Sequence, residues 1–306
     1  MTEPSISANP PFFILGCVRS GTTMLRNILR KHPNLASPEE THFFRWSEPF
    51  RGPVYTHVAT SNVTLKRHRQ IDGISEEEFG ELLALSTSRA DLCRRYMSLY
   101  MSRAKPGAAR WFDKSPQNAY GAAMIASEFP GARFLHIVRN PINVVASLRI
   151  GKVMKVADLV GACSYWNEAE ANLAVLKRAF PSRVLELSYE AFTANPSAGI
   201  QEVLQFLGEP FDAKFFADVV TEEVRHDKSG VLSEEEMSTV RTLCRTGRVR
   251  HGYGDPTDEA DQAAIKQAAQ RQKRSAQAKA ARTAAAKTAK KDRKKPGPGA
   301  QEPASD

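Results

Sequence analysis

The sequence predicts an α/β protein in which a parallel β-sheet lies between two layers of helices, a three-layer α/β/α arrangement. Two observations carry this prediction. Short apolar runs typical of buried strands alternate with longer amphipathic stretches of helical periodicity. With 306 residues, the chain is long enough for one sizeable domain and a small appendage. Ligands of such sheets bind at the carboxyl ends of the strands, so we expect chemistry in the residues directly after each strand.

The expected strands and helices follow one another along the chain. Phe12–Leu15 is predicted to be a buried strand, and apolar residues within 24–29 recur as on one face of a helix. Ser75 and Glu78 have the spacing of a capping box and mark the start of another helix. Residues 45–72 are irregular and basic, which predicts a long loop or lid. Further strands are expected at 109–113, 132–138 and 183–189, and further helices at 90–103, 118–129, 141–150 and 157–180.

Residues 257–306 differ in composition from the rest of the chain. They contain 12 Lys/Arg and 6 Asp/Glu, a net charge of +6, which leaves +3 of the total of +9 for residues 1–256. Alanine gives this segment a high helix propensity, but it has almost no large apolar side chain with which to pack. We therefore expect one domain over residues 1–256, followed by a basic Ala/Lys-rich tail. We expect that tail to be disordered or a fraying helix, able to contact acidic surfaces.

Composition also predicts where the protein works. The four cysteines are far apart and have neither the spacing of a zinc site nor that of a disulfide scaffold. The first residues lack the basic stretch and apolar core of a signal peptide. No apolar run approaches the ~20 residues that a transmembrane helix needs. We expect a soluble, cytoplasmic protein without a metal site.

The turn after the first strand has the spacing of a phosphate-binding loop, Gly16-x-x-x-x-Gly21. Its backbone N–H groups and the start of the following helix both favour an anion. Hydroxyl and guanidinium donors are added by Arg19, Ser20, Thr22 and Thr23. The sequence therefore predicts a P-loop-like anion site.

A second cluster of polar residues follows the strand expected at 132–138. Arg139 stands at the end of that strand, and Asn140 and Pro141 suit a turn into a helix with proline at its first position. Ser147 lies two helical turns further on and reaches the same anion only if that helix packs along the loop. The chain thus has two anion-binding clusters after two strands.

The two clusters by themselves are also compatible with a kinase or with a non-catalytic binding protein. A nucleoside-triphosphate-binding loop carries lysine where this chain has Thr22, and Asp113, a possible metal-holding residue, is followed by Lys114. Both observations weigh against an ATP-dependent P-loop kinase, which we keep as an alternative hypothesis. Another is a non-catalytic protein that binds a nucleotide or a nucleic acid, which would explain the tail but leave Glu40 and Lys114 without a role.

Four segments together resemble the sulfotransferase superfamily that uses 3′-phosphoadenosine 5′-phosphosulfate (PAPS). The resemblance is strongest to the branch that contains bacterial small-substrate enzymes and tyrosylprotein sulfotransferases, and it extends from about Phe12 to Tyr253. GCVRSGTTML resembles the 5′-phosphosulfate loop of this family, and RFLHIVRNPINVVASL resembles its 3′-phosphate motif. HPNLASPEETHFF resembles the segment with the acceptor-activating glutamate. RWFDKSPQN supplies a lysine where related enzymes have one near the sulfuryl group.

The resemblance implies transfer of a sulfuryl group from PAPS to a hydroxyl or amine acceptor by in-line displacement, with the 3′,5′-bisphosphate PAP as product and no metal. It assigns Arg139 and Ser147 to the 3′-phosphate. It favours Glu40 over its neighbour Glu39 as the general base that takes the acceptor's proton.

Roles are also expected for other residues. His42 would share the base role or hold the acceptor. Lys114 and Arg19 would stabilise charge on the bridging and sulfuryl oxygens. Tyr189, after the last strand, is either a neighbour of the nucleotide or a core residue. Candidates for a late loop that closes over the nucleotide are Lys228, Ser229, Arg245 and Arg248.

The acceptor stays open at this point. A sugar, lipid, phenol, small amine or peptide all fit the sequence. The basic stretch 45–69 hints at an anionic or carbohydrate acceptor if it lies near the site. The oligomeric state is not predicted.

Overall fold

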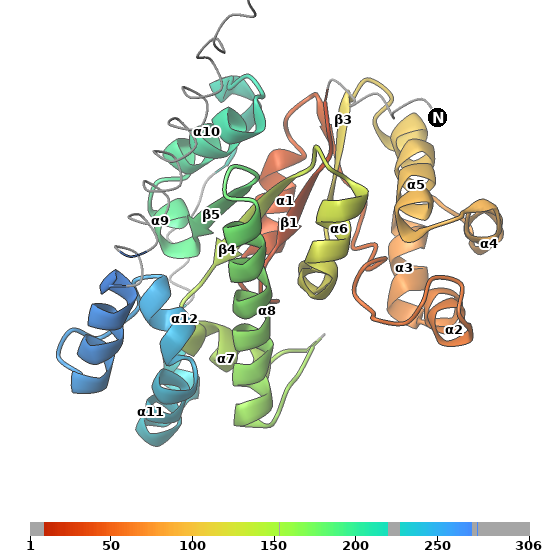
Figure 1. The fold of residues 1–306 in the computed structure, drawn as a ribbon. Coiled ribbons are helices and arrows are strands. Elements are labelled where there is room, and N and C mark those ends of the chain that lie inside the picture. Colours follow the sequence, from red (N-terminus) through yellow and green to blue (C-terminus); the bar gives the residue numbers. More distant parts are fainter. Residues whose placement is uncertain (1–8, 153, 220–226, 271–273, 275–306) are drawn as a thin grey trace, which may run out of the picture.

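A computed structural model describes residues 9–152, 154–219, 227–270 and 274. Within these ranges, five parallel strands form one sheet in the order β2-β3-β1-β4-β5 (Figure 1). The strands are β1 (Phe12–Leu15), β2 (Leu35–Ala36), β3 (Arg110–Lys114), β4 (Arg133–Val138) and β5 (Val184–Ser188). The predicted α/β class and parallel sheet are confirmed, and the two-residue edge strand β2 was not predicted because it is too short to show a pattern.

The central strand β1 shows how the three layers arise. Phe12 and Ile14 point to one face of the sheet and Phe13 and Leu15 to the other, because successive side chains of a strand alternate. The first face is covered by α1 (Thr22–Leu29), α9 (Tyr189–Ala194) and α10 (Pro196–Leu207). The second is covered by α5 (Arg89–Ala104), α6 (Ala122–Glu128) and α8 (Leu159–Ala179).

The predicted loop or lid at 45–72 is wrong, because most of it is helical. The structure has α2 (Pro53–Ser61) and α3 (Val63–Ile71) in this region. Proline stands at the first turn of α2, and the Asn62 side chain accepts hydrogen bonds from two backbone N–H groups of α3. Only a few side chains of these helices, such as Tyr55 and Leu65, are buried. The apolar periodicity is therefore too sparse to be recognised in the sequence.

The other helices agree with the sequence where it made a prediction. The capping box of Ser75 and Glu78 is present at the start of α4 (Glu76–Leu85). The remaining elements are α7 (Pro141–Arg149), α11 (Glu234–Leu243), α12 (Arg245–Arg250) and the 3₁₀ helices η1 (Pro116–Gly121), η2 (Ala213–Phe216) and η3 (Ser229–Val231).

Helices α7, α8, α11 and α12 enclose a separate apolar cluster around the fully buried Trp166. Its indole N–H donates to the backbone carbonyl of Arg139, 3.1 Å away. This cluster therefore packs against the carboxyl end of β4, at the edge of the sheet where ligands are expected.

The first part of the expected tail belongs to this packed region. Residues 259–270 are helical, and the buried Asp261 accepts hydrogen bonds from Arg245 (2.9 Å), from the Asp255 backbone N–H (2.8 Å) and from Arg248. Most of the tail lies outside the described residues. The boundary predicted at 256 stays a prediction, and these contacts favour a later one.

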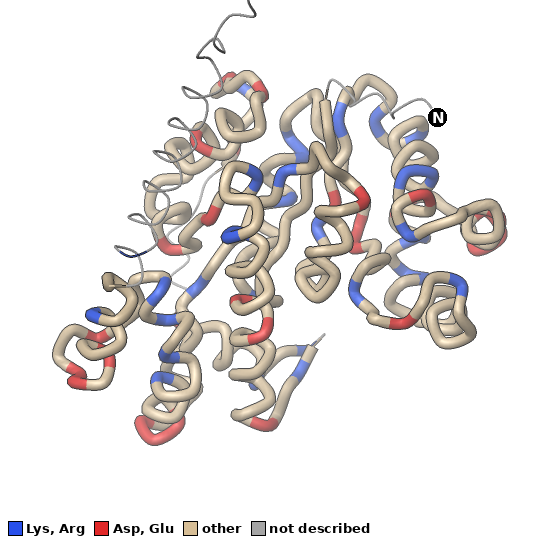
Figure 2. The backbone as a smooth tube through the Cα atoms, in the orientation of Figure 1, with Lys and Arg blue, Asp and Glu red and all other residues tan. Residues whose placement is uncertain are grey.

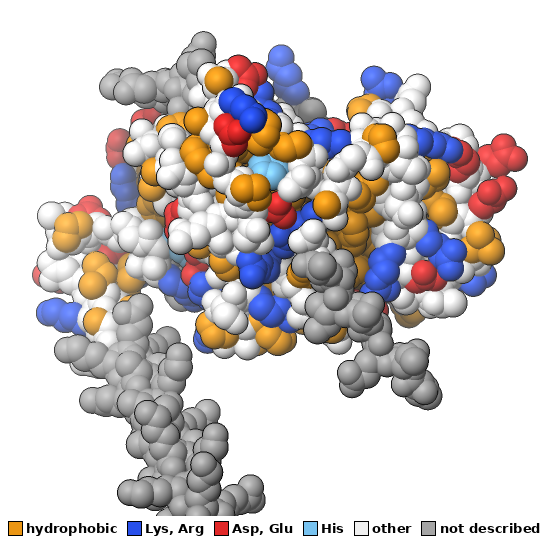
Figure 3. All heavy atoms as spheres, turned by 90° about the horizontal axis from the view of Figure 1, so that it is seen from above, with side chains coloured by type: hydrophobic (Ala, Val, Ile, Leu, Met, Phe, Trp, Pro, Cys, Tyr) orange, Lys and Arg blue, Asp and Glu red, His pale blue; other side chains and the backbone are white. Residues whose placement is uncertain are grey.

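Charged residues of both signs are spread along the described chain (Figure 2) and over the face seen from above (Figure 3). None of the helices in the described part of the chain has the length and apolar character needed to cross a membrane.

Asp261 provides a test of the later boundary. Asp261→Asn should lower the free energy of unfolding by about 3 kcal/mol, because it leaves the buried Arg248 guanidinium without its charge partner. Asp258→Asn is the matched control, since Asp258 is only partly buried and lies 3.9 Å from Arg245. Urea denaturation measures both. Equal, small effects of the two substitutions would contradict the assignment of residues 259–270 to the domain.

A buried histidine on β4 predicts a pH dependence of stability. His136 contacts Glu170 at 3.2 Å and Glu186 at 3.7 Å, and Glu170 also contacts His251 at 2.6 Å. Burial alone would lower the pKa of His136, but the two carboxylates raise it from 6.5 to about 9. This stabilisation is complete below pH 6.5 and is lost as the pH rises through about 9. The melting temperature should therefore fall over this range, and it should fall less in His136→Gln.

Candidate functional site

The turn between β1 and α1 has a backbone that only certain residues allow. Gly21 has φ of 93°, and a Cβ atom there would lie 2.5 Å from the ring of Tyr189. A Cβ atom on Gly16 would lie 2.7 Å from the carbonyl oxygen of Ile137 in β4. Arg19 has φ of 71°, a left-handed conformation that is uncommon for this residue type. The two glycines are thus required by the close approach of β4 and Tyr189.

The same turn contains a polar group that lacks a partner. The Ser20 hydroxyl is fully buried and makes no hydrogen bond to any described residue. It lies directly before Gly21, whose carbonyl accepts the first backbone hydrogen bond of α1. An orphaned buried hydroxyl beside a helix N-terminus fits an anion bound in the loop.

The second predicted cluster lies against the first. Arg139 donates to the backbone carbonyl of Arg19 at 3.2 Å, and its guanidinium stacks on the ring of Tyr189 at 4.4 Å. Arg19 Nε donates to Ser147 Oγ at 3.0 Å. Helix α7 therefore does pack along the loop, and the two clusters are joined through Arg19.

Sequence reasoning missed the residue that holds this second cluster in place. Glu190 Oε1 accepts from the backbone N–H of Asn140 at 3.0 Å, and Glu190 Oε2 accepts from the Tyr253 hydroxyl at 2.5 Å. The Asn140 side chain caps α7 by accepting from the Ile142 backbone N–H. No local signal marked Glu190, because its partners are 50 and 63 residues away in the sequence.

The third group of predicted residues meets at the end of β3. The Lys114 ammonium contacts Glu40 Oε1 and donates to Thr23 Oγ1 at 3.0 Å. His42 Nε2 lies 3.1 Å from Glu40 Oε2. Lys114 is almost completely buried, whereas the side chain of Glu40 is 24% exposed. Glu40 is therefore held from both sides while part of its side chain stays open to solvent.

Charges control the protonation of these groups. Burial alone would raise the pKa of Glu40, but the hydrogen bonds and charges of His42 and Lys114 lower it to about 2. Burial lowers the pKa of Lys114, and Glu40 opposes this effect. Burial likewise lowers the pKa of His42. At neutral pH the carboxylate of Glu40 is ionised and paired.

Glu39 has a different environment from Glu40. Its carboxylate accepts hydrogen bonds from Arg26 in α1 at 2.7 Å and from Arg30, directly after α1, at 3.2 Å. Its backbone N–H donates to Asp72 at 2.8 Å. Glu39 therefore ties the loop to α1 and α3, and the two adjacent carboxylates do point into different surroundings.

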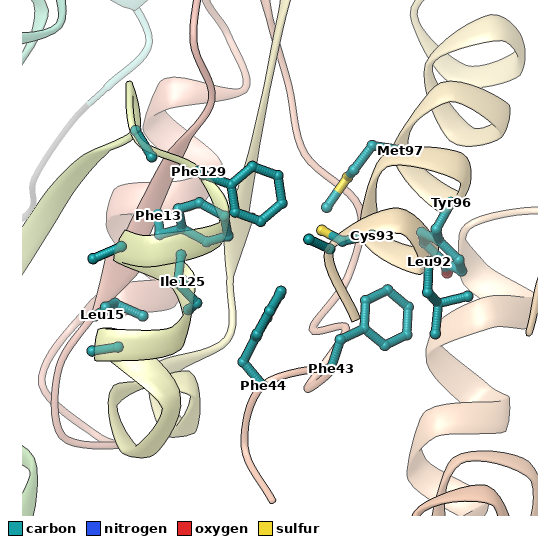
Figure 4. Packing of buried hydrophobic residues seen from close by; sticks show 14 of the residues in the cluster. Phe13, Leu15, Phe43, Phe44, Leu92, Cys93, Tyr96, Met97, Ile125 and Phe129 are labelled. Atoms are coloured by element: carbon teal, nitrogen blue, oxygen red, sulfur yellow. The ribbon is translucent and has the colours of Figure 1, made fainter. Parts of the chain in front are cut away.

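The loop that carries Glu40 and His42 is anchored on both sides. The next residues, Phe43 and Phe44, insert between α5 and α6 (Figure 4), with ring contacts to Tyr96 at 5.4 Å and Phe129 at 6.2 Å. His42 itself has φ of 55°. The anchoring side chains thus fix a backbone conformation that is unfavourable for histidine.

Asp113 completes this anchoring and was not predicted to do so. It accepts hydrogen bonds from Ser115 Oγ at 3.1 Å and Asn118 Nδ2 at 2.8 Å. Ser115 Oγ and Asn118 Oδ1 in turn accept from the backbone N–H groups of His42 and Phe44 at 3.1 Å each. Burial raises the pKa of Asp113 to about 6. Both of its oxygens accept hydrogen bonds from the protein, which argues against the metal-holding role that Asp113 would have in a kinase.

The candidates for the late loop separate clearly. Arg245 and Arg248 bind Asp261 and lie in the packed C-terminal region. Lys228 is tied to α7, since its backbone N–H donates to Asn143 Oδ1 at 2.7 Å. Burial lowers the pKa of Lys228, and the positive charges of Arg19 and Arg139 lower it further. Of these candidates, Lys228 is the one whose charge interacts with the anion clusters. Residues 220–226 lie outside the described residues.

In the described ranges, no group of three or more His, Cys, Asp or Glu side chains is arranged to hold a metal ion. The site combines three basic or hydroxyl-rich turns, after β1, β3 and β4, with a partly open carboxylate. Such an arrangement can bind a ligand with two separate anionic groups and can place an acceptor group beside Glu40.

Two relatives of known name are similar to this chain in sequence. The chain is 26% identical over 240 residues to a protein-tyrosine sulfotransferase of Drosophila melanogaster, covering 76% of this chain and 44% of that protein. It is 30% identical over 137 residues to the nodulation protein NoeE of Sinorhizobium fredii, covering 45% of this chain and 30% of that protein. The chain thus spans less than half the length of these two relatives.

Solved structures show the same fold. The sulfotransferase domain of the Synechococcus PCC 7002 olefin synthase superposes with a TM-score of 0.57 at 22% identity, covering 87% of this chain and 98% of that domain. A sulfotransferase from Alicyclobacillus acidocaldarius superposes with a TM-score of 0.51 at 20% identity, covering 79% of this chain and 94% of that one.

A family model described as "Sulfotransferase family" matches residues 10–213, a range that contains β1 to β5 and the three turns of the site. The protein therefore belongs to the sulfotransferase family.

Proposed function

We propose that this protein is a PAPS-dependent sulfotransferase that transfers a sulfuryl group to a hydroxyl acceptor, with Glu40 as the general base. The observation that carries the proposal is the contact of Arg19 with Ser147, 3.0 Å long. This contact joins two anion-binding turns, as a donor with a 5′-phosphosulfate and a separate 3′-phosphate requires. An amine acceptor would need the same base.

The donor would occupy both turns. Its 5′-phosphosulfate would lie on the backbone N–H groups of residues 17–23, where the Ser20 hydroxyl lacks a partner. Its 3′-phosphate would lie between Arg139 and Ser147, with Lys228 nearby. These positive charges repel one another in the free protein, so a bisphosphate relieves an existing electrostatic cost.

The buried Lys114 would couple donor and acceptor. In the free protein its ammonium is shared between Glu40 and Thr23. A phosphosulfate beside Thr23 would attract the ammonium, which would then stabilise the charge that develops on the bridging oxygen of the leaving PAP. The pKa of Glu40 would rise as Lys114 moves away, which would make it a stronger base when the donor is bound.

The acceptor oxygen would then attack sulfur in line with the bridging oxygen while Glu40 takes its proton. His42, 3.1 Å from Glu40, would orient the carboxylate. The donor supplies a reactive sulfuryl group, and the residues named here bind it, orient the acceptor and hold the proton.

We further propose that the protein acts in the cytoplasm. All four cysteines are free and buried, which suits a reducing compartment.

Binding of PAP tests the donor site. Arg139→Ala should weaken binding of PAP, measured by calorimetry without metal, by at least ~10-fold, because a hydrogen bond to a charged group is lost. Arg178→Ala is the matched control, since Arg178 is exposed on α8 and should not change the affinity. Binding of ATP with Mg²⁺ but not of PAP would overturn the proposal in favour of a kinase.

Substitution of Glu40 tests the base. Glu40→Gln should lower kcat by ~10²–10⁴, the usual contribution of a general base, while PAP still binds. Turnover is measured with labelled PAPS and the best acceptor of a panel of phenols, sugars and amines. The control is Glu39→Gln, which should lower the melting temperature through its lost contacts to Arg26 and Arg30 without a comparable loss of kcat. A larger loss of kcat in the Glu39 variant would show that Glu39, and not Glu40, is the base.

A further inference from the structure

A cavity of about 460 Å³ lies close to the loop that carries the proposed base. One wall follows directly from the loop of Glu40 and His42, since the ring of Trp46 lies 6.2 Å from that of His42. A second wall is formed by η1, which starts two residues after Lys114, and a third by the first turns of α8. Its principal lining side chains are Arg45, Trp46, Gln117, Tyr120, Tyr165 and Glu168. Glu40 is near enough for its charge to act on Arg45, so an acceptor bound here would lie on the side of the proposed base.

The aromatic side chains favour a flat acceptor. Trp46, Tyr120 and Tyr165 contribute three rings from three different segments of the chain. Tyr120 is 42% exposed, and its hydroxyl donates to Glu168 Oε2 at 2.9 Å. This hydrogen bond engages the carboxylate of Glu168. The remaining ring surfaces offer stacking partners to a planar group.

Arg45 gives the cavity its charge preference. Its guanidinium lies 5.4 Å from the ring centre of Trp46 and makes no hydrogen bond or ion pair with any described residue. Arg19 and Lys114 differ in this respect, since Arg19 donates to Ser147 and Lys114 to Glu40. Arg45 is half-buried, and burial lowers its pKa. A half-buried guanidinium that has only an aromatic ring beside it and no hydrogen-bond acceptor favours an anionic ligand.

We propose that the acceptor is a planar aromatic hydroxyl compound with a carboxylate, and that Arg45 selects it by binding this carboxylate. The inference rests on the proposed sulfotransferase function and specifies its acceptor. The phenolic oxygen forms the new O–S bond, the bond between sulfur and the bridging oxygen of PAPS breaks, PAP leaves with the electron pair, and the phenolic proton moves to Glu40.

Three matched phenols test the charge preference. They are 4-hydroxyphenylacetate, the neutral 4-(2-hydroxyethyl)phenol and the cationic tyramine, which share the ring and differ in the group at its far end. We expect kcat/KM for the carboxylate to exceed that for the neutral phenol by about 10- to 100-fold, the contribution of a hydrogen-bonded charge. Tyramine should be the poorest of the three.

Substitution of Arg45 tests the residue. In Arg45→Gln the ratio of kcat/KM between the carboxylate and the neutral phenol should fall to about one, and in Arg45→Glu tyramine should become the preferred acceptor. Arg51→Gln is the matched control, because Arg51 is exposed and does not line the cavity, and it should keep the wild-type ratio.

The outcomes separate the two proposals. If PAP binds but none of the phenols is sulfated, or if only sugars are, the acceptor class is wrong. The same holds if the neutral phenol is used as well as the carboxylate, or if Arg45→Gln keeps the wild-type ratio. If PAP does not bind, the sulfotransferase function itself fails.

Discussion

The buried ammonium of Lys114 is the constraint on which the rest of the site depends. A lysine that is only 1% exposed must be paired, because an isolated buried charge is very costly. Glu40 and Thr23 provide the pairing, and each comes from a different segment of the chain. The end of β3, the start of α1 and the loop before α2 are therefore held together by one charge. Together, His42 and this ion pair keep Glu40 ionised in the free protein, with a pKa of about 2.

The two anion-binding clusters contain more positive charge than nearby carboxylates neutralise. Arg19, Arg139 and Lys228 lie close enough for their charges to affect one another. The carboxylate of Glu190, whose charge acts on Arg139, accepts hydrogen bonds from the Asn140 backbone and the Tyr253 hydroxyl. Positive charge is thus gathered at the carboxyl ends of β1 and β4, and the neutralising groups are used to hold the backbone. A multiply charged anionic ligand is the natural counterpart of such an arrangement.

The anion-binding turns and the proposed acceptor cavity come from different segments of the region that matches the family. The family match covers residues 10–213, which include the turns after β1, β3 and β4. Residues of the proposed acceptor cavity also lie within this range, and they come from the loop after His42, from η1 and from α8. These segments connect elements of the sheet without forming part of it, so they can differ between proteins that share the fold. Acceptor chemistry therefore has to be read from side chains such as Arg45 and Trp46 rather than from the fold.

Local sequence patterns determined much of the fold. Four of the five strands and the helices α1 and α4 to α8 follow from apolar periodicity and end signals, because these depend on neighbours within a few residues. The helices at 53–71 did not follow, since few of their side chains are buried and the pattern is sparse. The two glycines and the arginines at strand ends marked the anion site for a similar reason, as short-range spacing was enough.

Only the tertiary structure decided how the site is assembled. Which of two adjacent glutamates faces Lys114, whether Ser147 reaches Arg19, and that Asp113 and Glu190 support the backbone are all contacts between residues distant in the sequence. The free charge of Arg45 could not be inferred either, because being unpaired depends on everything that packs around a side chain. The sequence by itself determined the elements and the chemical types at their ends, whereas partners and burial were set by three-dimensional packing, which no local pattern encodes.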